Sequence, residues 1–138
     1  MDFKLKDKRV IVTGGSRGIG LSIAREFAKE GAAVSICARG QESLGKARSL
    51  LEKSGGKVHV ATCDVSDPPS LQEYIEDAVA ALSGLNILVN NPSGFGRTDD
   101  EAGWQAGLDI DLMALVRGSW AAVPHIEKAG GGALIHTS

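Results

Sequence analysis

The chain has 138 residues, of which 43% are hydrophobic, 23% are charged and 4% are aromatic, and its formal net charge at pH 7 is −2. This length is enough for one domain with a hydrophobic core, and we predict that residues 1–138 form one soluble domain. The nearly balanced charge excludes the strongly basic composition typical of nucleic-acid-binding or membrane-surface proteins.

The sequence also indicates a cytoplasmic location. No apolar run approaches the roughly 20 residues that a membrane-spanning helix needs. The first ten residues lack the apolar segment of a secretory signal. The two cysteines, Cys37 and Cys63, each lie in a short apolar run that predicts a buried strand. A disulfide between them is possible, but the context favours two inert core thiols in a reducing compartment.

The first half of the chain alternates short apolar runs with amphipathic segments. Residues 8–13 predict a buried strand. The next segment has a helical period, with Ile19, Ile23 and Phe27 spaced four residues apart on one face. Gly31 is placed to end this helix in a left-handed conformation. Further strands are predicted at residues 33–38, 58–62, 86–89 and 134–136, and further helices at residues 41–53, 68–84 and 101–128.

Regular alternation of strands and helices is the pattern of a parallel sheet covered on both faces. Crossover connections in such sheets are right-handed, which favours a doubly wound topology. We therefore predict an α/β fold with a doubly wound parallel sheet of about five strands. Asp67 and Pro68, an N-cap residue followed by proline at the first helical position, support the start of the third helix.

A glycine-rich segment joins the first strand to the first helix. Residues 13–20, TGGSRGIG, fit the spacing G-x-x-x-G-x-G through Gly14, Gly18 and Gly20. A pyrophosphate must approach the backbone closely and lie where unpaired N–H groups begin a helix, and such a loop meets both needs. A P-loop ends in Gly-Lys-Ser/Thr, whereas here Gly20 is followed by Leu21 and Ser22, so the lysine is absent. A tight turn without a ligand is the alternative.

Five segments in order resemble the motifs of the short-chain dehydrogenase/reductase family. They are TGGSRGIG (13–20), CDVSD (63–67), NNPSG (90–94), WQAGLDIDLM (104–113) and GGALIHTS (131–138). The resemblance covers essentially the whole chain, and the ordered set is more specific than any single motif. It implies a Rossmann-type domain, truncated after about five strands, that forms the N-terminal part of a longer family fold.

The resemblance also implies which residues contact a nicotinamide cofactor. In the family an Asp, here Asp64, contacts the adenine, and the segment that ends the fourth strand supports the sheet centre and lines the cofactor cleft. The predicted cofactor-binding residues are Gly14, Ser16, Arg17, Gly18, Ile19, Gly20, Arg39, Asp64, Val65, Asn90, Pro92 and Ser93. We predict no metal ligands.

The residue after the second strand indicates which cofactor is used. In this fold that position lies beside the adenosine ribose, where an acidic residue binds the ribose hydroxyls and a basic one accepts a 2′-phosphate. Arg39 occupies it, and Arg17 in the glycine loop is placed to reach the same phosphate. Two solvated surface arginines are the alternative, but the pair together favours NADP over NAD.

The catalytic pattern of the family is incomplete in this chain. The family uses a Tyr whose pKa is lowered by a Lys four residues later, a Ser that polarises the substrate carbonyl and an Asn that holds a relay water. The single tyrosine, Tyr74, is followed four residues later by alanine, so we predict a partly buried helix residue and not a catalyst. Asp111 occupies the Asn position. Its carboxylate only accepts hydrogen bonds, but in the family the main-chain carbonyl largely holds the water, and an acid favoured by the helix dipole is the alternative.

Ser138 stands at or beside the position of the catalytic serine. The family usually has two serines here, the second of which is catalytic, and Ser138 aligns better with the first. A shift of one residue would make it the catalytic serine, so Asp111 and Ser138 are the candidate catalytic residues. Pro92 replaces a family Ala and removes an N–H from the cleft wall, and His136 replaces an Asn in a place where a structural role is expected.

Three interpretations follow. The first is the cofactor-binding half of an NADP-dependent oxidoreductase that transfers hydride between NADPH and a small carbonyl or alcohol substrate, inactive by itself. The second is a stand-alone nucleotide-binding or regulatory module, and the third is an interaction module in which the last helix pairs with another chain. An exposed sheet edge and an apolar helix face predict a homo-oligomer. The residues of that face are Leu112, Leu115, Val116, Val123 and Ile126.

Overall fold

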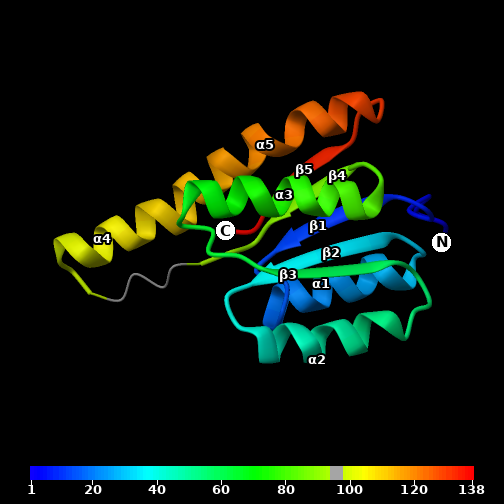
Figure 1. Ribbon diagram of the computed structural model, residues 1–138, viewed down its shortest axis with the longest axis horizontal. Helices are drawn as coiled ribbons and strands as arrows, with labels where there is room; N and C mark the ends of the chain where they lie inside the picture. Colours follow the sequence, from blue (N-terminus) through cyan, green and yellow to red (C-terminus); the bar gives the residue numbers. More distant parts are fainter. Residues whose placement is uncertain (94–97) are drawn as a thin grey trace.

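The chain folds around a five-stranded parallel sheet with helices on both faces (Figure 1). The computed structural model describes residues 1–93 and 98–138. The strands lie in the order β3-β2-β1-β4-β5, and every adjacent pair is parallel. This confirms the predicted doubly wound sheet. The strands are β1 (Arg9–Thr13), β2 (Ala33–Ala38), β3 (Val58–Thr62), β4 (Ile87–Asn90) and β5 (Ala133–His136).

Two layers of helices cover the sheet. On one face lie α1 (Gly18–Lys29) and α2 (Gln41–Glu52), and on the other lie α3 (Pro68–Leu82) and α5 (Ala114–Lys128) (Figure 1). Successive strand residues point to opposite faces, so β1 contributes to both layers. Val10 and Val12 belong to the cluster under α1 and α2, whereas Ile11 belongs to the cluster under α3 and α5. All three side chains are completely buried, which explains why this strand is a continuous apolar run in the sequence.

The helix ends follow the predicted signals with one difference. Asp67 caps α3 by accepting a hydrogen bond from the N–H of Ser70 at 3.2 Å, and Pro68 occupies the first helical position. Gly31, with a φ of 87°, ends α1 as predicted. At the end of α3 the left-handed C-cap is Ser83, with a φ of 64°, and the expected glycine follows it.

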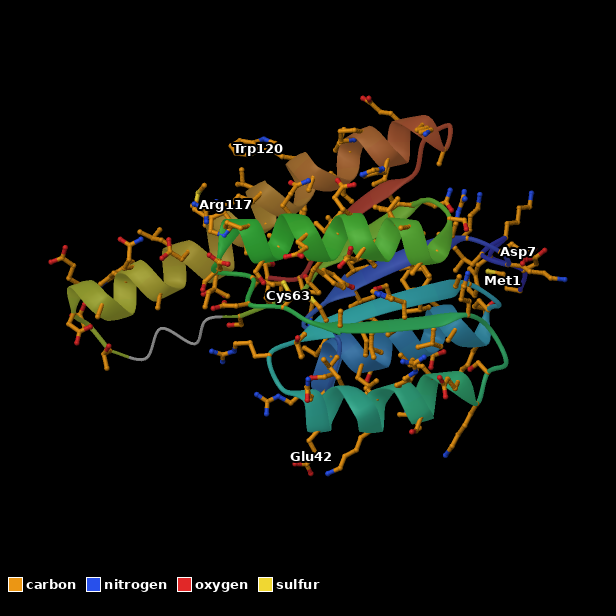
Figure 2. All side chains as sticks on the ribbon, viewed as in Figure 1. Met1, Asp7, Glu42, Cys63, Arg117 and Trp120 are labelled. Atoms are coloured by element: carbon orange, nitrogen blue, oxygen red, sulfur yellow. The ribbon has the colours of Figure 1, made fainter. Side chains whose placement is uncertain are left out.

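The predicted long helix from residue 101 to 128 is divided into three parts. A π-helical segment, η1 (Leu108–Met113), separates α4 (Glu101–Gly107) from α5. The C-cap N–H of η1, from Ala114, donates to the carbonyl of Asp109, five residues back. Among the described residues, α4 packs only against η1 and extends away from the sheet (Figure 1). Trp120 of α5 points into solvent, while Cys63 lies inward between α3 and the sheet (Figure 2).

Four predictions need correction. Of the predicted apolar helix face, only Leu112 is exposed, whereas Ile126 is buried in the core and Leu115, Val116 and Val123 are half-buried. Ile19 was expected on the core face of α1, but its side chain is 68% exposed, because it lies in the first turn, where the helix leaves the loop. Tyr74 is completely enclosed and not partly buried, with 3% of its surface exposed. Cys63 follows β3 and is not part of it, although both cysteines are buried free thiols. In the parts of the chain that the structure describes, every helix is too short or too polar to cross a bilayer.

Candidate cofactor-binding site

Two glycines give the loop between β1 and α1 its shape. Gly18 has a φ of 57°, a conformation that residues with side chains rarely adopt, and a Cβ built there meets no atom within 4 Å. A Cβ on Gly20 would instead collide with the carbonyl oxygen of Gly14 and the amide nitrogen of Asn91. Gly20 therefore permits close packing of helix and loop, whereas Gly18 faces open space on the side that a ligand would approach.

The first turn of α1 offers N–H groups to that open space. The N-cap residue, Arg17, has an extended backbone, and its side chain makes no capping hydrogen bond. The first helical N–H groups and the positive end of the helix dipole therefore point out of the loop, which is the arrangement that binds phosphate groups. Arg17 and Ile19 are exposed at its mouth, and Ser16 is half-buried beside them.

Arg39 and Asp64 lie at one edge of the sheet, just beyond the ends of the neighbouring strands β2 and β3. The N–H of Cys63 donates to the carbonyl of Ala38 at 3.0 Å, which holds the two strand ends together. Hydrogen bonds from the hydroxyl and the N–H of Ser66 lower the pKa of Asp64, and the positive charge of Arg39 adds to this effect. Asp64 is therefore a carboxylate near neutral pH, and its electrostatic interaction with Arg39 places these exposed side chains on one rim.

The other residues of the predicted site divide between the rim and the interior. Val65 is partly buried and packs against the cluster under α3 and α5. Pro92 lies against the glycine loop, since a Cβ on Gly14 would be 3.3 Å from the Pro92 Cα. Ser93 is exposed, and Gly94 lies outside the described residues.

The structure places the Asn90 side chain away from the loop. Its amide nitrogen lies 3.4 Å from the Ser119 hydroxyl of α5 and 3.1 Å from Nδ1 of His136 on β5, and only 2% of the residue is exposed. Asn90 thus ties β4 to the helix above it and to the neighbouring strand. His136 takes part in this structural contact, in agreement with the role expected of it.

Asn91 is the site residue that the sequence reasoning missed. Its amide N–H donates to the Gly14 carbonyl at 3.1 Å, and its amide oxygen accepts from the Thr137 hydroxyl at 2.9 Å. Its backbone N–H also donates to the hydroxyl of Thr13 at 3.2 Å. One side chain therefore connects the glycine loop to the end of β5. The paired asparagines after β4 were the available signal.

Asn91→Ala should lower the free energy of unfolding by about 1–2 kcal/mol, because it leaves the Gly14 carbonyl and the Thr137 hydroxyl without this partner. Urea unfolding of the two proteins measures the change. Thr137→Val is the matched control: it removes the hydroxyl that donates to Asn91 and keeps the bond from Asn91 to the Gly14 carbonyl, so it should lose less. An unchanged unfolding midpoint for Asn91→Ala would show that the contact does not stabilise the loop.

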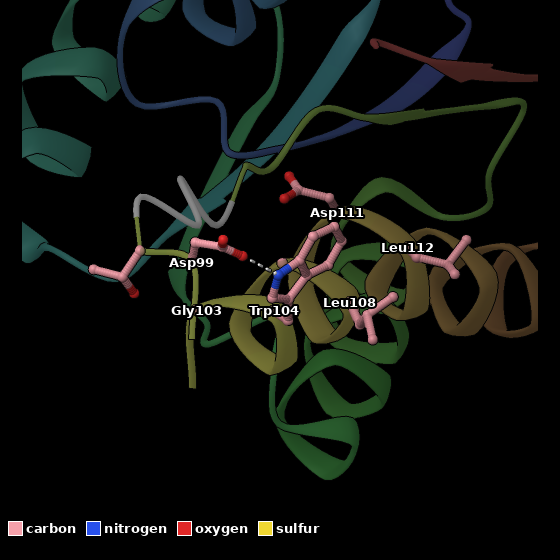
Figure 3. A pocket seen from close by; sticks show the side chains of 8 residues that line it. Asp99, Gly103, Trp104, Leu108, Asp111 and Leu112 are labelled. Atoms are coloured by element: carbon pink, nitrogen blue, oxygen red, sulfur yellow. Dashed lines mark hydrogen bonds between the residues drawn. The ribbon is translucent and has the colours of Figure 1, made fainter. Parts of the chain in front are cut away.

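The two candidate catalytic residues lie in different places. Ser138 follows β5 and is exposed, next to Thr137, whose N–H donates to the Asn90 carbonyl at 3.1 Å. Asp111 lies in η1 on the wall of a cavity of about 510 Å³ (Figure 3). Trp104 also lines this cavity and donates its indole N–H to Asp99 at 3.0 Å (Figure 3). Among the described residues, those that line this cavity include neither Ser138 nor the glycine loop.

Comparisons with known proteins agree with the fold. The family model described as short chain dehydrogenase matches residues 8–138. Dehydrogenase/reductase SDR family member 4 of Oryctolagus cuniculus is 35% identical over 136 residues, which are 95% of this chain and 52% of that protein. The chain spans about half the length of the curated relatives it matches.

Solved structures show the same fold with either nicotinamide cofactor. L-sorbose reductase from Gluconobacter frateurii, complexed with NADPH and L-sorbose, has a TM-score of 0.92 at 37% identity, covering 99% of this chain and 54% of that one. The NADH-dependent reductase A1-R′, complexed with NAD, has a TM-score of 0.89 at 25% identity, covering 100% and 62%. One of these neighbours is complexed with NADPH and the other with NAD, so the comparisons do not distinguish between the two cofactors.

Proposed function

Because the chain belongs to the short-chain dehydrogenase family, we propose that residues 1–138 form the cofactor-binding part of an NADP-dependent oxidoreductase that acts on a small carbonyl or alcohol substrate. The single observation that carries the proposal is the geometry of Gly18, whose positive φ and open flank adjoin the uncapped start of α1. These features fit a pyrophosphate, which needs close backbone approach and N–H donors.

Arg39 and Arg17 support NADP as the cofactor. Arg39 immediately follows β2, at the edge where the ribose of the adenosine would lie in this fold, and no acidic residue stands at that position. Its guanidinium would bind a 2′-phosphate through two parallel hydrogen bonds, and Arg17 would approach the same group from the glycine loop. NADPH in the L-sorbose reductase structure is in line with this choice.

The remaining contacts follow from where the strands end. Asp64 would accept a hydrogen bond from the adenine amino group, and Val65 would supply apolar contact beside it. Ser16, Ile19 and Gly20 would border the pyrophosphate. Pro92 and Ser93 would line the cleft beyond it, while the Asn90 side chain, bonded to α5 and β5, would not contact the cofactor.

NADPH, when bound, supplies the hydride. The chain's own residues would hold the cofactor and place its reactive end near the ends of β4 and β5. The main-chain carbonyl of Asp111 would hold a relay water, and the π-helical segment around it supports this role, since such segments often occur at functional sites. Ser138, or the residue that follows it in a longer protein, would polarise the substrate carbonyl. A stand-alone nucleotide-binding module is the second candidate, because the single tyrosine, Tyr74, is a buried residue of α3.

The 138-residue chain by itself should show no reductase activity with NADPH. Tyr74 is enclosed and hydrogen-bonded to Ser35, and burial raises its pKa well above the ordinary value, so it is not a proton donor for a substrate. An assay of NADPH oxidation with a panel of ketones and aldehydes measures the activity. Turnover above background would mean that another residue supplies the proton and that the catalytic assignment is wrong.

We also propose that the protein is a cytoplasmic homo-oligomer. Four large apolar side chains on α4, η1 and α5 are exposed, which favours association. They are Trp104, Leu108, Leu112 and Trp120. The two buried free thiols suit a reducing compartment. Light scattering after size-exclusion chromatography gives the oligomeric state, and a monomer at micromolar concentration would contradict the proposal.

A further inference from the structure

A chain of hydrogen-bonded side chains connects edge strand β3 to helix α3. His59 of β3 and Ser35 of β2 are direct neighbours across the two strands. The Ser35 hydroxyl lies 2.8 Å from Nδ1 of His59 and 2.6 Å from the hydroxyl of Tyr74 on α3. Ser35 is completely buried, and the His59 and Tyr74 rings stack with their centroids 6.2 Å apart. The family's chemistry does not use any of these three residues.

A neutral His59 ring satisfies every member of this chain. In the neutral tautomer that carries its proton on Nε2, Nδ1 accepts the Ser35 proton, and Ser35 accepts the Tyr74 proton. A protonated ring donates from both nitrogens, so Nδ1 no longer accepts and Ser35 must turn its proton towards Tyr74. The Tyr74 proton is then left with the sulfur of Cys37, with which Tyr74 also interacts and which is only a weak acceptor.

We propose that His59, Ser35 and Tyr74 form a pH-sensitive lock that fastens β3 to α3 while the His59 ring is neutral and loosens when the ring is protonated. Among the described strands, β3 lies at the edge of the sheet and pairs on one side only, with β2, so its attachment to α3 matters more than that of a central strand.

The surroundings of His59 agree with a lock that needs a neutral ring. Burial lowers the pKa of His59, the negative charge of Asp77 on α3 opposes that effect, and the positive charge of Arg48 on α2 adds to it. Tyr74 itself, Cys37 and Cys63 are the other titratable groups around the ring's hydrogen-bonding partners. A His pKa that is lower in the folded state means that the unfolded chain binds more protons in mild acid, so stability is lost as the pH falls below the ordinary His value.

The lock adjoins the proposed cofactor site. The segment between β3 and α3 contains Cys63, Asp64 and Val65. Loosening of β3 would therefore displace the carboxylate of Asp64, which is proposed to contact the adenine. This consequence rests on the proposed function, whereas the lock itself does not. The experiment therefore has one arm without cofactor and one with it.

Tyr74 is the only tyrosine in the sequence, so a ¹³C-tyrosine label reports on the lock alone. In the intact protein its ring resonance should shift with pH, with a midpoint below about 6.5, the ordinary His value. The shift should disappear in His59→Gln, whose neutral amide still accepts from Ser35. It should shrink in Ser35→Ala, in which the His59 ring still stacks on Tyr74 but the connecting hydroxyl is lost. It should persist in the matched control His125→Gln, which removes a histidine paired with Glu76 outside this chain. A Tyr74 signal that does not titrate, or that titrates equally in His59→Gln, overturns the proposal.

The second arm compares NADP⁺ binding to the intact protein and to His59→Gln at about pH 7.5 and about pH 5.5. Comparing the two proteins at the same pH cancels the titration of the ligand's own phosphate. The unmodified protein should bind about threefold or more weakly relative to His59→Gln at the lower pH only. If the two proteins bind NADP⁺ equally at both pH values while the Tyr74 resonance still titrates, the lock is supported. Its proposed effect on the segment that contains Asp64 is then overturned. No binding by either protein at either pH contradicts the proposed function and not the lock.

Discussion

Gly18→Val should abolish detectable NADPH binding while leaving the chain folded. A Cβ at this position meets no protein atom within 4 Å, so the new side chain would occupy the space proposed for the pyrophosphate and not the core. The φ of 57° makes the substitution strained, at roughly 1–2 kcal/mol of folding free energy. Isothermal titration with NADPH measures the binding, and urea unfolding measures the strain.

Gly55→Val is the matched control for this prediction. Gly55, in the turn before β3, also has a positive φ, of 81°, and its Cβ would also meet nothing within 4 Å. The two variants should therefore lose similar stability, and only Gly18→Val should lose the cofactor. If Gly18→Val binds NADPH with unchanged affinity, the phosphate does not lie in this loop.

Arg39→Ala should weaken NADPH binding by at least about tenfold and change NADH binding little. A hydrogen-bonded contact with a charged group contributes on the order of 1.5–3 kcal/mol, which corresponds to about tenfold or more in the dissociation constant. NADH lacks the 2′-phosphate, so the removal of the Arg39 side chain removes no phosphate contact from it. Titrations of the variant with both cofactors measure the two changes.

Arg25→Ala supplies the control for Arg39→Ala. Arg25 is an exposed arginine on the outer face of α1, and its removal changes the net charge of the protein by the same amount. It should leave both affinities within about twofold of the unmodified protein, because surface charges away from a ligand are screened by salt. Equal weakening of NADPH and NADH by Arg39→Ala would contradict the assignment of Arg39 to the 2′-phosphate.

Much of the fold was predictable because its signals are local. The apolar run of β1 and the N-cap Asp67 lie within a few residues of the structure they specify. The glycine loop was predictable for the same reason, since the spacing of Gly14, Gly18 and Gly20 reflects the turn itself. Its context between a strand and a helix is visible in the sequence.

Other features depend on contacts between distant residues, which a local pattern does not contain. The bonds of Asn91 join residues 77 and 46 positions apart, so its role appears only when β1, β4 and β5 are assembled. The exposure of Ile19 depends on where the sheet ends beneath α1, which helical periodicity does not report. The η1 segment differs from an α-helix in its hydrogen-bond spacing and not in its composition. The contact of Ser35 with His59 depends on the register of β2 and β3.

The most direct test of NADP recognition compares the binding of two ligands, one with and one without a 2′-phosphate. Isothermal titration of the unmodified protein with 2′,5′-ADP and with 5′-AMP compares molecules that differ only in the 2′-phosphate. If Arg39 and Arg17 hold that phosphate, 2′,5′-ADP should bind at least about tenfold more tightly. Equal affinities for the two ligands, or tighter binding of 5′-AMP, would contradict NADP as the cofactor.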